Sequence, residues 1–363
     1  MAGEGLTELF LCELAVGTSV SVLREAVEEA GTAEEFFELT KEDLFRVGLL
    51  KSDAFFERFS EFREPERLEQ VLEEAETQGI RFVPESSEAY PKKLLDLPDR
   101  PFGLFVRGSL PDPDRRSVAV IGSRKCSTYG KETALFFGEA FARAGLNVIS
   151  GMALGVDGYA GRGALRADGA SFAVLGGGVD ICYPRENLDL YEQLKVRGGI
   201  LSERPPGLYA RNFDFPLRNR IISGLSDAVA VIEAAENSGS LITVDHALSQ
   251  NREVFAVPGR INDRMALGTN RLIREGAEIL TCPEDLLSRL GLPVGKDTKG
   301  PKKAVLTKEE AVLAEEIRKG DCDLEELMGN TGFPASALME VLVRLEIKDV
   351  IRRENGGKYH LQA

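Results

Sequence analysis

Between residues 117 and 280 the sequence alternates short apolar segments with longer amphipathic ones. The apolar segments have the length of buried strands, and the amphipathic segments repeat their apolar residues at helical spacing. This alternation is typical of β–α–β units, whose right-handed crossovers build one parallel sheet with helices on both faces. We therefore expect an α/β fold with an extended Rossmann-like parallel sheet. The expected strands are 117–121, 147–150, 171–175, 199–201, 228–232, 253–257 and 277–280, and the helices between them are 129–144, 156–167, 188–196, 218–224, 241–250 and 267–275.

Two smaller segments flank this region. Residues 1–80 hold short helical patterns separated by glycines, which predicts a small helical domain. After residue 306, three helical patterns and two short strands around Gly356-Gly357 predict a winged helix. The composition of the segment between sheet and winged helix is that of a flexible linker. The expected parts are therefore 1–80, 81–290, 291–306 and 307–363.

The net charge of −14 would at first disfavour binding to a polyanion. The acidic residues are unevenly placed, however. Residues 1–80 hold seven Lys and Arg against twenty Asp and Glu, whereas residues 81–290 hold equal numbers of basic and acidic residues. Since phosphate contacts depend on the local field, a neutral middle segment can still present a basic face. The acidic helical segment is better suited to contact a protein than DNA.

The cysteines, the histidines and the lengths of the apolar runs exclude further classes of protein. The five cysteines are scattered without a C-x-x-C pair, and the chain has two histidines, so we expect no disulfide framework, no metal and no cofactor. Apolar runs such as 118–121 are too short to cross a bilayer, and the first residues lack the pattern of a signal peptide. We expect a reduced, cytoplasmic protein with no membrane segment.

Glycine, hydroxyl and basic residues recur where the predicted strands end. In an open α/β sheet, ligands bind at the carboxyl ends of the strands. Glycine lets a backbone approach a phosphate closely, and the free N–H groups of a following helix favour an anion. These loops together predict a site for a phosphate-bearing backbone. Its candidate residues are Gly122, Ser123, Arg124, Lys125, Gly151, Arg185, Ser238, Gly239 and Ser240, with a further turn at Gly176-Gly177-Gly178.

Arginines alternate with aromatic residues between positions 204 and 220. Arginine pairs with phosphates and aromatic rings stack on unpaired bases, so Phe213 is a candidate stacking residue, with Phe215 as the alternative. The candidates that follow are Arg218, Asn219 and Arg220. The two arginines lie on opposite sides of a helix start, so one of them is expected to face the strand. A structural alternative remains equally open, in which the phenylalanines fill the core and the arginines cap local carboxylates.

Few residues in the sequence form a pattern that suggests catalysis. His246 and His360 have no nucleophile or metal-ligand partners in the pattern, and no catalytic residue is predicted. Glu233, after a predicted strand, keeps open an alternative function as a nucleotide phosphoribohydrolase-like enzyme that uses a carboxylate on a ribose. A second alternative is a transcription regulator acting through the winged helix. Its recognition helix, 335–345, carries Glu340 and a single basic residue, Arg344, which suits a DNA groove poorly.

The loops, taken in order, closely resemble those of the DNA-processing protein A (DprA/Smf) family. The resemblance covers about residues 80–285 and implies an extended Rossmann fold that binds single-stranded DNA, forms a homodimer and loads the RecA recombinase during natural transformation. An N-terminal domain of the sterile-alpha-motif type and a C-terminal winged helix also occur in this family. The matching motifs are Val120-Ile-Gly-Ser-Arg124, Ser150-Gly-Met-Ala-Leu-Gly-Val-Asp157, Tyr183-Pro-Arg-Glu-Asn187, Phe215-Pro-Leu-Arg-Asn-Arg-Ile-Ile222, Ser238-Gly-Ser240, Val257-Pro-Gly259, Gly268-Thr-Asn-Arg-Leu-Ile273 and Gly276-Ala277.

By this resemblance Arg124 binds DNA phosphate, with Arg185 and the arginines of Arg218-Asn219-Arg220 as the next candidates. The sequence departs from the family pattern at two places. Gly161 stands where members usually have a histidine, and the N-terminal segment has Val16-Gly-Thr-Ser-Val20 in place of a Gly-Ile-Gly hairpin. The second departure weakens the expectation of an N-terminal DNA contact. The sheet also resembles that of cytokinin-activating phosphoribohydrolases, but their Pro-Gly-Gly-x-Gly-Thr signature is not present.

Overall fold

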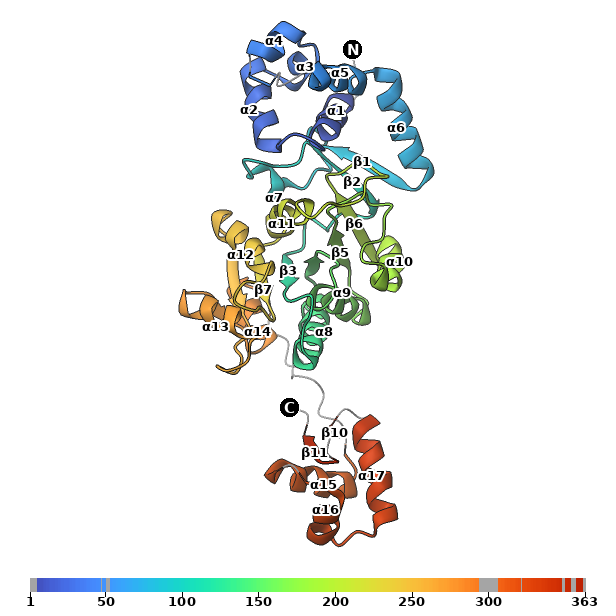
Figure 1. Ribbon diagram of the computed structural model, residues 1–363, viewed down its shortest axis with the longest axis vertical. Coiled ribbons are helices and arrows are strands. Elements are labelled where there is room, and N and C mark those ends of the chain that lie inside the picture. The colour runs from blue at the N-terminus through green and yellow to red at the C-terminus, as the bar shows by residue number, and fades with distance from the viewer. Residues whose placement is uncertain are drawn as a thin grey trace. The chain divides into compact units, whose positions relative to one another are not determined.

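The chain divides into two units, residues 1–298 and residues 299–363, which are described separately. In the larger unit a nine-stranded sheet carries helices on both faces (Figure 1). The predicted linker at 291–306 falls largely outside the described residues. The computed structural model describes residues 5–46, 48–49, 53–293, 306–320, 322–347, 350–353 and 357–361.

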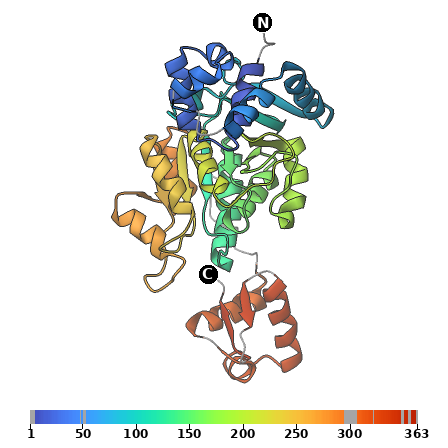
Figure 2. The ribbon, with the colours of Figure 1, turned by 45° about the horizontal axis from the view of Figure 1, so that its top comes forward.

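Six helices lie within the described residues of the N-terminal segment, in agreement with its helical patterns. Their core is aromatic: the ring of Phe10 meets that of Phe59 edge-on at 5.0 Å, and Phe36 packs against both. These helices share a core with Phe105 and Ile200 of the sheet, and they lie beside the edge formed by β1 and β2 (Figures 1 and 2). The helices are α1 (Leu6–Leu14), α2 (Val20–Ala30), α3 (Ala33–Phe37), α4 (Lys41–Arg46), α5 (Asp53–Phe62) and α6 (Pro65–Thr77).

The sheet has the strand order β1-β2-β6-β5-β4-β3-β7-β8-β9. The strands from β6 to β9 in this order run parallel, but β2 is antiparallel to β6 and β1 is antiparallel to β2. All the predicted strands therefore run parallel, and the two antiparallel edge strands are additions that the sequence prediction did not include. The strands are β1 (Ile80–Pro84), β2 (Gly103–Gly108), β3 (Ser117–Ile121), β4 (Asn147–Ser150), β5 (Ser171–Val174), β6 (Gly198–Ser202), β7 (Ala228–Val231), β8 (Glu253–Ala256) and β9 (Glu278–Ile279).

Alternate residues of each central strand face opposite helix layers. In β3, Ala119 and Ile121 face one apolar core, while Val118 and Val120 face the other. A strand buried on both faces needs apolar residues at every position, which explains the continuous runs in the sequence. The first layer holds α7 (Lys92–Leu95), α11 (Asp214–Gly224), α12 (Ser240–Ser249) and α13 (Leu267–Arg274), and the second holds α8 (Thr128–Arg143), α9 (Val156–Arg166), α10 (Leu188–Arg197) and α14 (Pro283–Arg289).

The smaller unit has the three helices and the hairpin expected of a winged helix. Leu313, Leu327 and Leu342, one from each helix, meet Tyr359 of the hairpin in a separate apolar core. The two hairpin strands pair antiparallel. The elements are α15 (Lys308–Lys319), α16 (Leu324–Thr331), α17 (Ala335–Ile347), β10 (Ile351–Arg353) and β11 (Tyr359–Leu361).

Candidate nucleic-acid interface

The loops that follow the parallel strands meet at one edge of the sheet. Strand β3 lies at the point where the chain reverses its direction across the sheet, since it continues through α8 to β4 on one side and pairs with β7 on the other. Such a switch point, at the carboxyl ends of the strands, is where ligands bind in open α/β sheets. The candidate residues at 122–125, at 151 and at 238–240 all follow strands of this group.

The loop after β3 holds Arg124 at the surface through backbone contacts. The Ser123 N–H donates to the Glu233 carbonyl at 2.8 Å, and the Ser123 carbonyl accepts from Val156 N–H. Gly155 has φ +74, and a Cβ there would lie 2.2 Å from the Ser123 oxygen, so this close crossing requires glycine. The loop leaves Arg124 and Lys125 exposed, and neither has an ion pair within the described residues. Two unpaired cations thus project from a fixed loop.

Arg124 belongs to a group of stacked side chains. Its guanidinium carbon lies 5.2 Å from the centre of the Phe215 ring, and that ring stacks on Tyr183 at 5.5 Å. Phe215 and Tyr183 line a pocket of about 90 Å³, here called the aromatic pocket, together with the exposed Tyr209. Exposed π-faces beside an unpaired cation are the features that bind unpaired bases and their phosphates. The remaining lining residues are Gly151, Leu175, Gly176, Gly177, Ile181, Ala210 and Arg218.

Arg218 lies in the wall of the aromatic pocket and is 5% exposed. Its guanidinium donates to the carbonyls of Gly151 and Val174, and a Cβ on Gly151 would lie 2.5 Å from one of its nitrogens. Burial lowers the pKa of Arg218 to about 10, and the charge of Arg124 acts in the same direction. Arg218 therefore stays protonated at neutral pH next to a second cation. Asp157 offsets part of this charge, and an incoming anion would further relieve the repulsion between the two cations.

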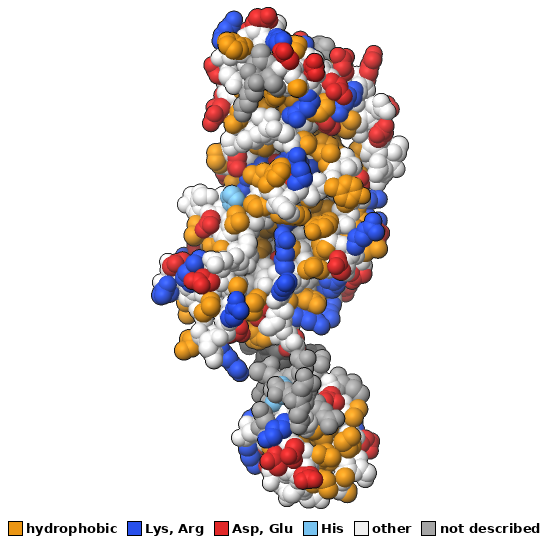
Figure 3. All heavy atoms as spheres, viewed as in Figure 1, with side chains coloured by type: hydrophobic (Ala, Val, Ile, Leu, Met, Phe, Trp, Pro, Cys, Tyr) orange, Lys and Arg blue, Asp and Glu red, His pale blue; other side chains and the backbone are white. Residues whose placement is uncertain are grey.

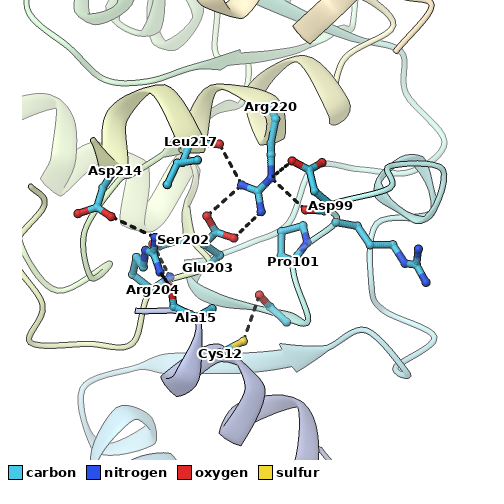
Figure 4. Close-up of polar contacts among 12 residues, drawn as sticks. Cys12, Ala15, Asp99, Pro101, Ser202, Glu203, Arg204, Asp214, Leu217 and Arg220 are labelled. Atoms are coloured by element: carbon cyan, nitrogen blue, oxygen red, sulfur yellow. Dashed lines mark hydrogen bonds and ion pairs between the residues drawn. The ribbon is translucent and has the colours of Figure 1, made fainter. Parts of the chain in front are cut away.

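The predicted DNA contact at Arg220 is wrong for a physical reason. The Arg220 side chain is 3% exposed and makes a bidentate ion pair with the buried Glu203, with nitrogen–oxygen distances of 2.9 and 2.6 Å (Figure 4). Its Nε lies 3.1 Å from an Asp99 carboxylate oxygen. All three guanidinium nitrogens are thereby engaged and the side chain is buried, so a phosphate cannot reach it. The structural alternative, an arginine that caps carboxylates, holds for Arg220 but not for Arg218.

The other candidates are distributed around this edge. Arg185 is exposed in the turn Arg185–Asn187, directly after Tyr183 and Pro184, and has no ion pair in the part of the chain that is described. Phe213 is 54% exposed and packs against the Arg211 guanidinium at 4.3 Å. Asn219 is half-buried and accepts a hydrogen bond from Arg218 Nε. Arg185 and Phe213 thus remain accessible, while Asn219 supports its neighbour.

The serine loop lies on the other side of β3 from the aromatic pocket. Ser238-Gly239-Ser240 follows β7 and begins α12, and the two hydroxyl oxygens lie 2.8 Å apart. The neighbouring Glu233 is 3% exposed, and its carboxylate accepts from the backbone N–H and the hydroxyl of Ser127 at the start of α8. A carboxylate fixed in this way stabilises a helix N-terminus and is poorly placed to reach a ribose.

Three aromatic residues of the pocket are missing from the predicted site. Tyr183, Tyr209 and Phe215 line the aromatic pocket, whereas Phe213, the aromatic residue chosen, does not. The sequence held a signal for two of them, because Tyr183 lies two residues before the predicted Arg185 and Phe215 is the alternative to Phe213. The helix register that turns Phe215 and Arg218 to the same pocket begins at Asp214, four residues earlier than the predicted helix.

The surface reflects the uneven charge of the sequence. On the face drawn in Figure 3, acidic side chains gather over the N-terminal helices, and basic and hydrophobic side chains occupy the middle of the larger unit. In the smaller unit, Arg344 of α17 pairs with Glu340 at 2.6 Å, which leaves the expected recognition helix without a free cation among its described side chains. The described residues contain neither a helix that could span a membrane nor a three-residue cluster suited to a metal ion.

Fold and site together define a class, namely a Rossmann-like α/β protein with a basic and aromatic strand edge and an appended winged helix. Comparison with known families identifies the particular one. Residues 81–291 match the family model of DNA recombination-mediator protein A, and residues 297–357 match that of the DprA winged helix domain. The chain belongs to the DNA recombination-mediator protein A family, which confirms the resemblance seen in the loop motifs.

Individual relatives agree with this assignment. The chain is 40% identical to DNA processing protein DprA of Bacillus subtilis over 225 residues, which are 62% of this chain and 76% of that protein. It is 45% identical to protein Smf of Escherichia coli over 209 residues, 57% of this chain and 56% of the relative, so it spans little more than half of that protein.

Solved structures give the same assignment. DNA processing protein A of Streptococcus pneumoniae superposes with a TM-score of 0.68 at 31% identity, covering 81% of this chain and all of that one. The Helicobacter pylori protein, whose structure concerns its single-stranded DNA binding mode, gives a TM-score of 0.51 at 29% identity over 56% of this chain and 94% of that one. The extended Rossmann-like prediction is thus confirmed.

Proposed function

We propose that this protein binds single-stranded DNA along the carboxyl edge of its sheet. One observation carries the proposal: the unpaired Arg124 lies against the Phe215–Tyr183 stack, with the buried cation of Arg218 in the wall of the same pocket. Arg124, Lys125 and Arg185 would contact phosphates, assisted by the glycine loops at Gly122, Gly151 and Gly176. An unpaired base would stack on the exposed rings.

Single strands fit this site better than duplexes do. The rings are reached only by bases that are not already stacked in a duplex, and stacking contributes about 1–3 kcal/mol per base without sequence preference. Fixed cations on a rigid loop add an attraction that falls with salt, because counterions are released from the strand. Ser238, Gly239 and Ser240 would extend this track beyond the aromatic pocket, while Arg220 has no part in it.

Family membership supports a proposal about the partners. A recombination mediator hands its strand to a recombinase, so we propose that the protein loads RecA on incoming DNA during natural transformation and acts as a cytoplasmic homodimer. Two copies would double the contacts to one strand and raise its effective affinity. Light scattering at micromolar concentration should give the mass of a dimer, and a monomer would contradict this part of the proposal.

We do not propose catalysis. The phosphoribohydrolase alternative depended on Glu233, and its carboxylate is engaged by Ser127 at the start of α8. If the alternative were right, wild-type protein would release free base from nucleoside monophosphates and Glu233→Gln would not.

A binding titration tests the proposed function. Fluorescence anisotropy with a labelled thymidine oligomer, single-stranded or annealed to its complement, should give tighter binding to the single strand. The affinity should fall steeply between low and physiological salt. Preference for the duplex, or a salt-independent affinity, would contradict the proposal.

A further inference from the structure

A second pocket lies on the opposite side of α11 from the aromatic pocket. Its volume is about 350 Å³, and its walls come from the sheet edge and from the α1–α2 connection of the N-terminal helices. Phe215 and Arg218 of α11 face the aromatic pocket, whereas Leu217 and Arg220, each two residues further along, face this second one. The segment from Tyr209 to Arg220 thus forms the wall between the two pockets. We call the second one the junction pocket.

The α1–α2 connection is fixed against this wall by arginines. Arg204 Nη1 donates to the Ala15 carbonyl at 2.6 Å, and Arg211 Nη2 donates to the Val16 carbonyl at 2.6 Å (Figure 4 shows the Arg204 contact). Both arginines are held by the buried Asp214, the first residue of α11. Carbonyls at the end of α1 carry partial negative charge, which makes them suitable acceptors for these cations. The junction pocket therefore has a defined shape.

The mouth of the junction pocket presents groups suited to a nucleotide. Arg211 remains half exposed, and the Phe213 ring that packs on it is 54% exposed. Thr18, Ser19 and Ser21 also line the pocket, and the Ser19 side chain makes no capping hydrogen bond to α2. An aromatic face, a cation and hydroxyl groups around one opening are the combination that binds a base and its phosphate.

We propose that the junction pocket is a second binding site for the same DNA strand, which crosses the rim between Tyr209 and Phe213. This inference rests on the proposed function and extends it, because it makes the acidic N-terminal segment part of the DNA track. Tyr209 is 76% exposed on the aromatic-pocket side and Phe213 is exposed on the junction side, so the rim itself offers rings to passing bases. The two pockets are separated by α11, which is about 10–12 Å in diameter including its side chains. A strand of a few nucleotides therefore reaches one pocket, and a longer strand reaches both.

Oligonucleotides of different length distinguish the two sites experimentally. Thymidine oligomers of about four and about sixteen nucleotides, the range of known single-strand site sizes, are titrated with full-length protein. Ser21→Glu places a negative charge at the junction mouth, and Ser21→Gln is its neutral control of equal size. Glutamate in the first turn of α2 is favourable to the helix, so folding should be kept, and thermal unfolding verifies this. Phe213→Ala is the second variant, and Arg124→Ala reports on the first site.

The junction site predicts one pattern of affinities. Ser21→Glu and Phe213→Ala should weaken binding of the long oligomer about fivefold or more and leave the short one within about twofold, since a lost stacking contact corresponds to such a factor. Ser21→Gln should bind both as wild type does. Wild-type affinity of Ser21→Glu and Phe213→Ala for the long oligomer, or equal weakening of both lengths, overturns the inference. If Arg124→Ala binds both lengths as wild type does, the proposed function itself fails.

Discussion

The Arg124 guanidinium lies over the Phe215 ring, at 5.2 Å from its centre, although Arg124 follows β3 and Phe215 belongs to α11, far along the chain. The contact orients a long, flexible side chain without neutralising its charge. An ion pair would have offset part of the charge, and a free side chain would lose rotamer entropy on binding. We therefore expect the stacked cation to be preorganised for the proposed phosphate contact.

Substitutions at Arg124 should separate charge from orientation. Arg124→Ala should lower single-strand affinity about tenfold or more, since hydrogen bonds to a charged group contribute about 1.5–3 kcal/mol. Arg124→Lys should fall between alanine and wild type, because lysine keeps the charge but loses the planar stacking. Anisotropy titrations measure the affinities, with thermal unfolding as the control for folding. Equal affinities for lysine and arginine would show that the Phe215 contact is irrelevant to binding.

Salt dependence should report how many phosphates the site engages. For single strands the slope of log affinity against log salt falls by about 0.7 for each phosphate contact. Arg124→Ala and Arg185→Ala should each reduce the slope by about that amount, whereas Arg81→Ala, an exposed residue of the edge strand β1, should not change it. Titrations at four salt concentrations measure the slopes. Slopes unchanged in both site variants would place the phosphates elsewhere.

Most of the fold could be predicted from local sequence, and the predicted bounds of several elements agree with the structure to the residue. Strands Ser117–Ile121 and Asn147–Ser150 and helix Val156–Arg166 follow from their apolar periodicity, the helix within one residue. The edge strands β1 and β2 were missed because the segment from residue 80 to 113 reads as proline-rich. Pro84 is tolerated there because β1 is an edge strand with one unpaired side.

The site was less accessible to prediction, because it depends on residues distant in sequence. Spacing alone placed Arg218 and Arg220 on opposite sides of a helix, but not which of them would be sequestered. That outcome was decided by Glu203 and Asp99, which lie 17 and 121 residues from Arg220 in the chain. Likewise, Tyr183 and Phe215 become neighbours only because the β5 and β6 loops meet at one edge.

Arg220 should affect stability and not binding. Replacing it with Met leaves Glu203 charged and buried, which costs about 3–5 kcal/mol of unfolding free energy. The double variant Arg220→Met, Glu203→Gln should recover part of this loss, because the uncompensated charge is removed. Urea denaturation measures the unfolding free energies, and titration of the folded protein should give near wild-type affinity for a short thymidine oligomer. A stable Arg220→Met variant with weakened binding would return Arg220 to the site.

Acid should weaken the attachment of α7 to the sheet through Asp227. This carboxylate, just before β7, accepts hydrogen bonds from Lys93 of α7, Arg116 and the Ser117 N–H. Burial acts to raise its pKa, but these hydrogen bonds and charges outweigh burial and hold the pKa below the ordinary value of 3.8. A carboxylate with a lowered pKa in the folded state stabilises fully above its unfolded pKa, and that stability is lost as the pH falls through the folded value.

The pH window can be tested with Asp227→Asn. At pH 7 the variant should lose about 1–3 kcal/mol of unfolding free energy, because two cations and one N–H lose their charged acceptor. The difference from wild type should stay constant down to about pH 5 and shrink below about pH 4, where unfolded wild-type chains begin to bind the proton. Urea denaturation across this range measures it, with the exposed Asp245→Asn expected to stay within about 0.5 kcal/mol of wild type. A difference that grows on acidification would mean that Asp227 is held protonated, with the opposite linkage.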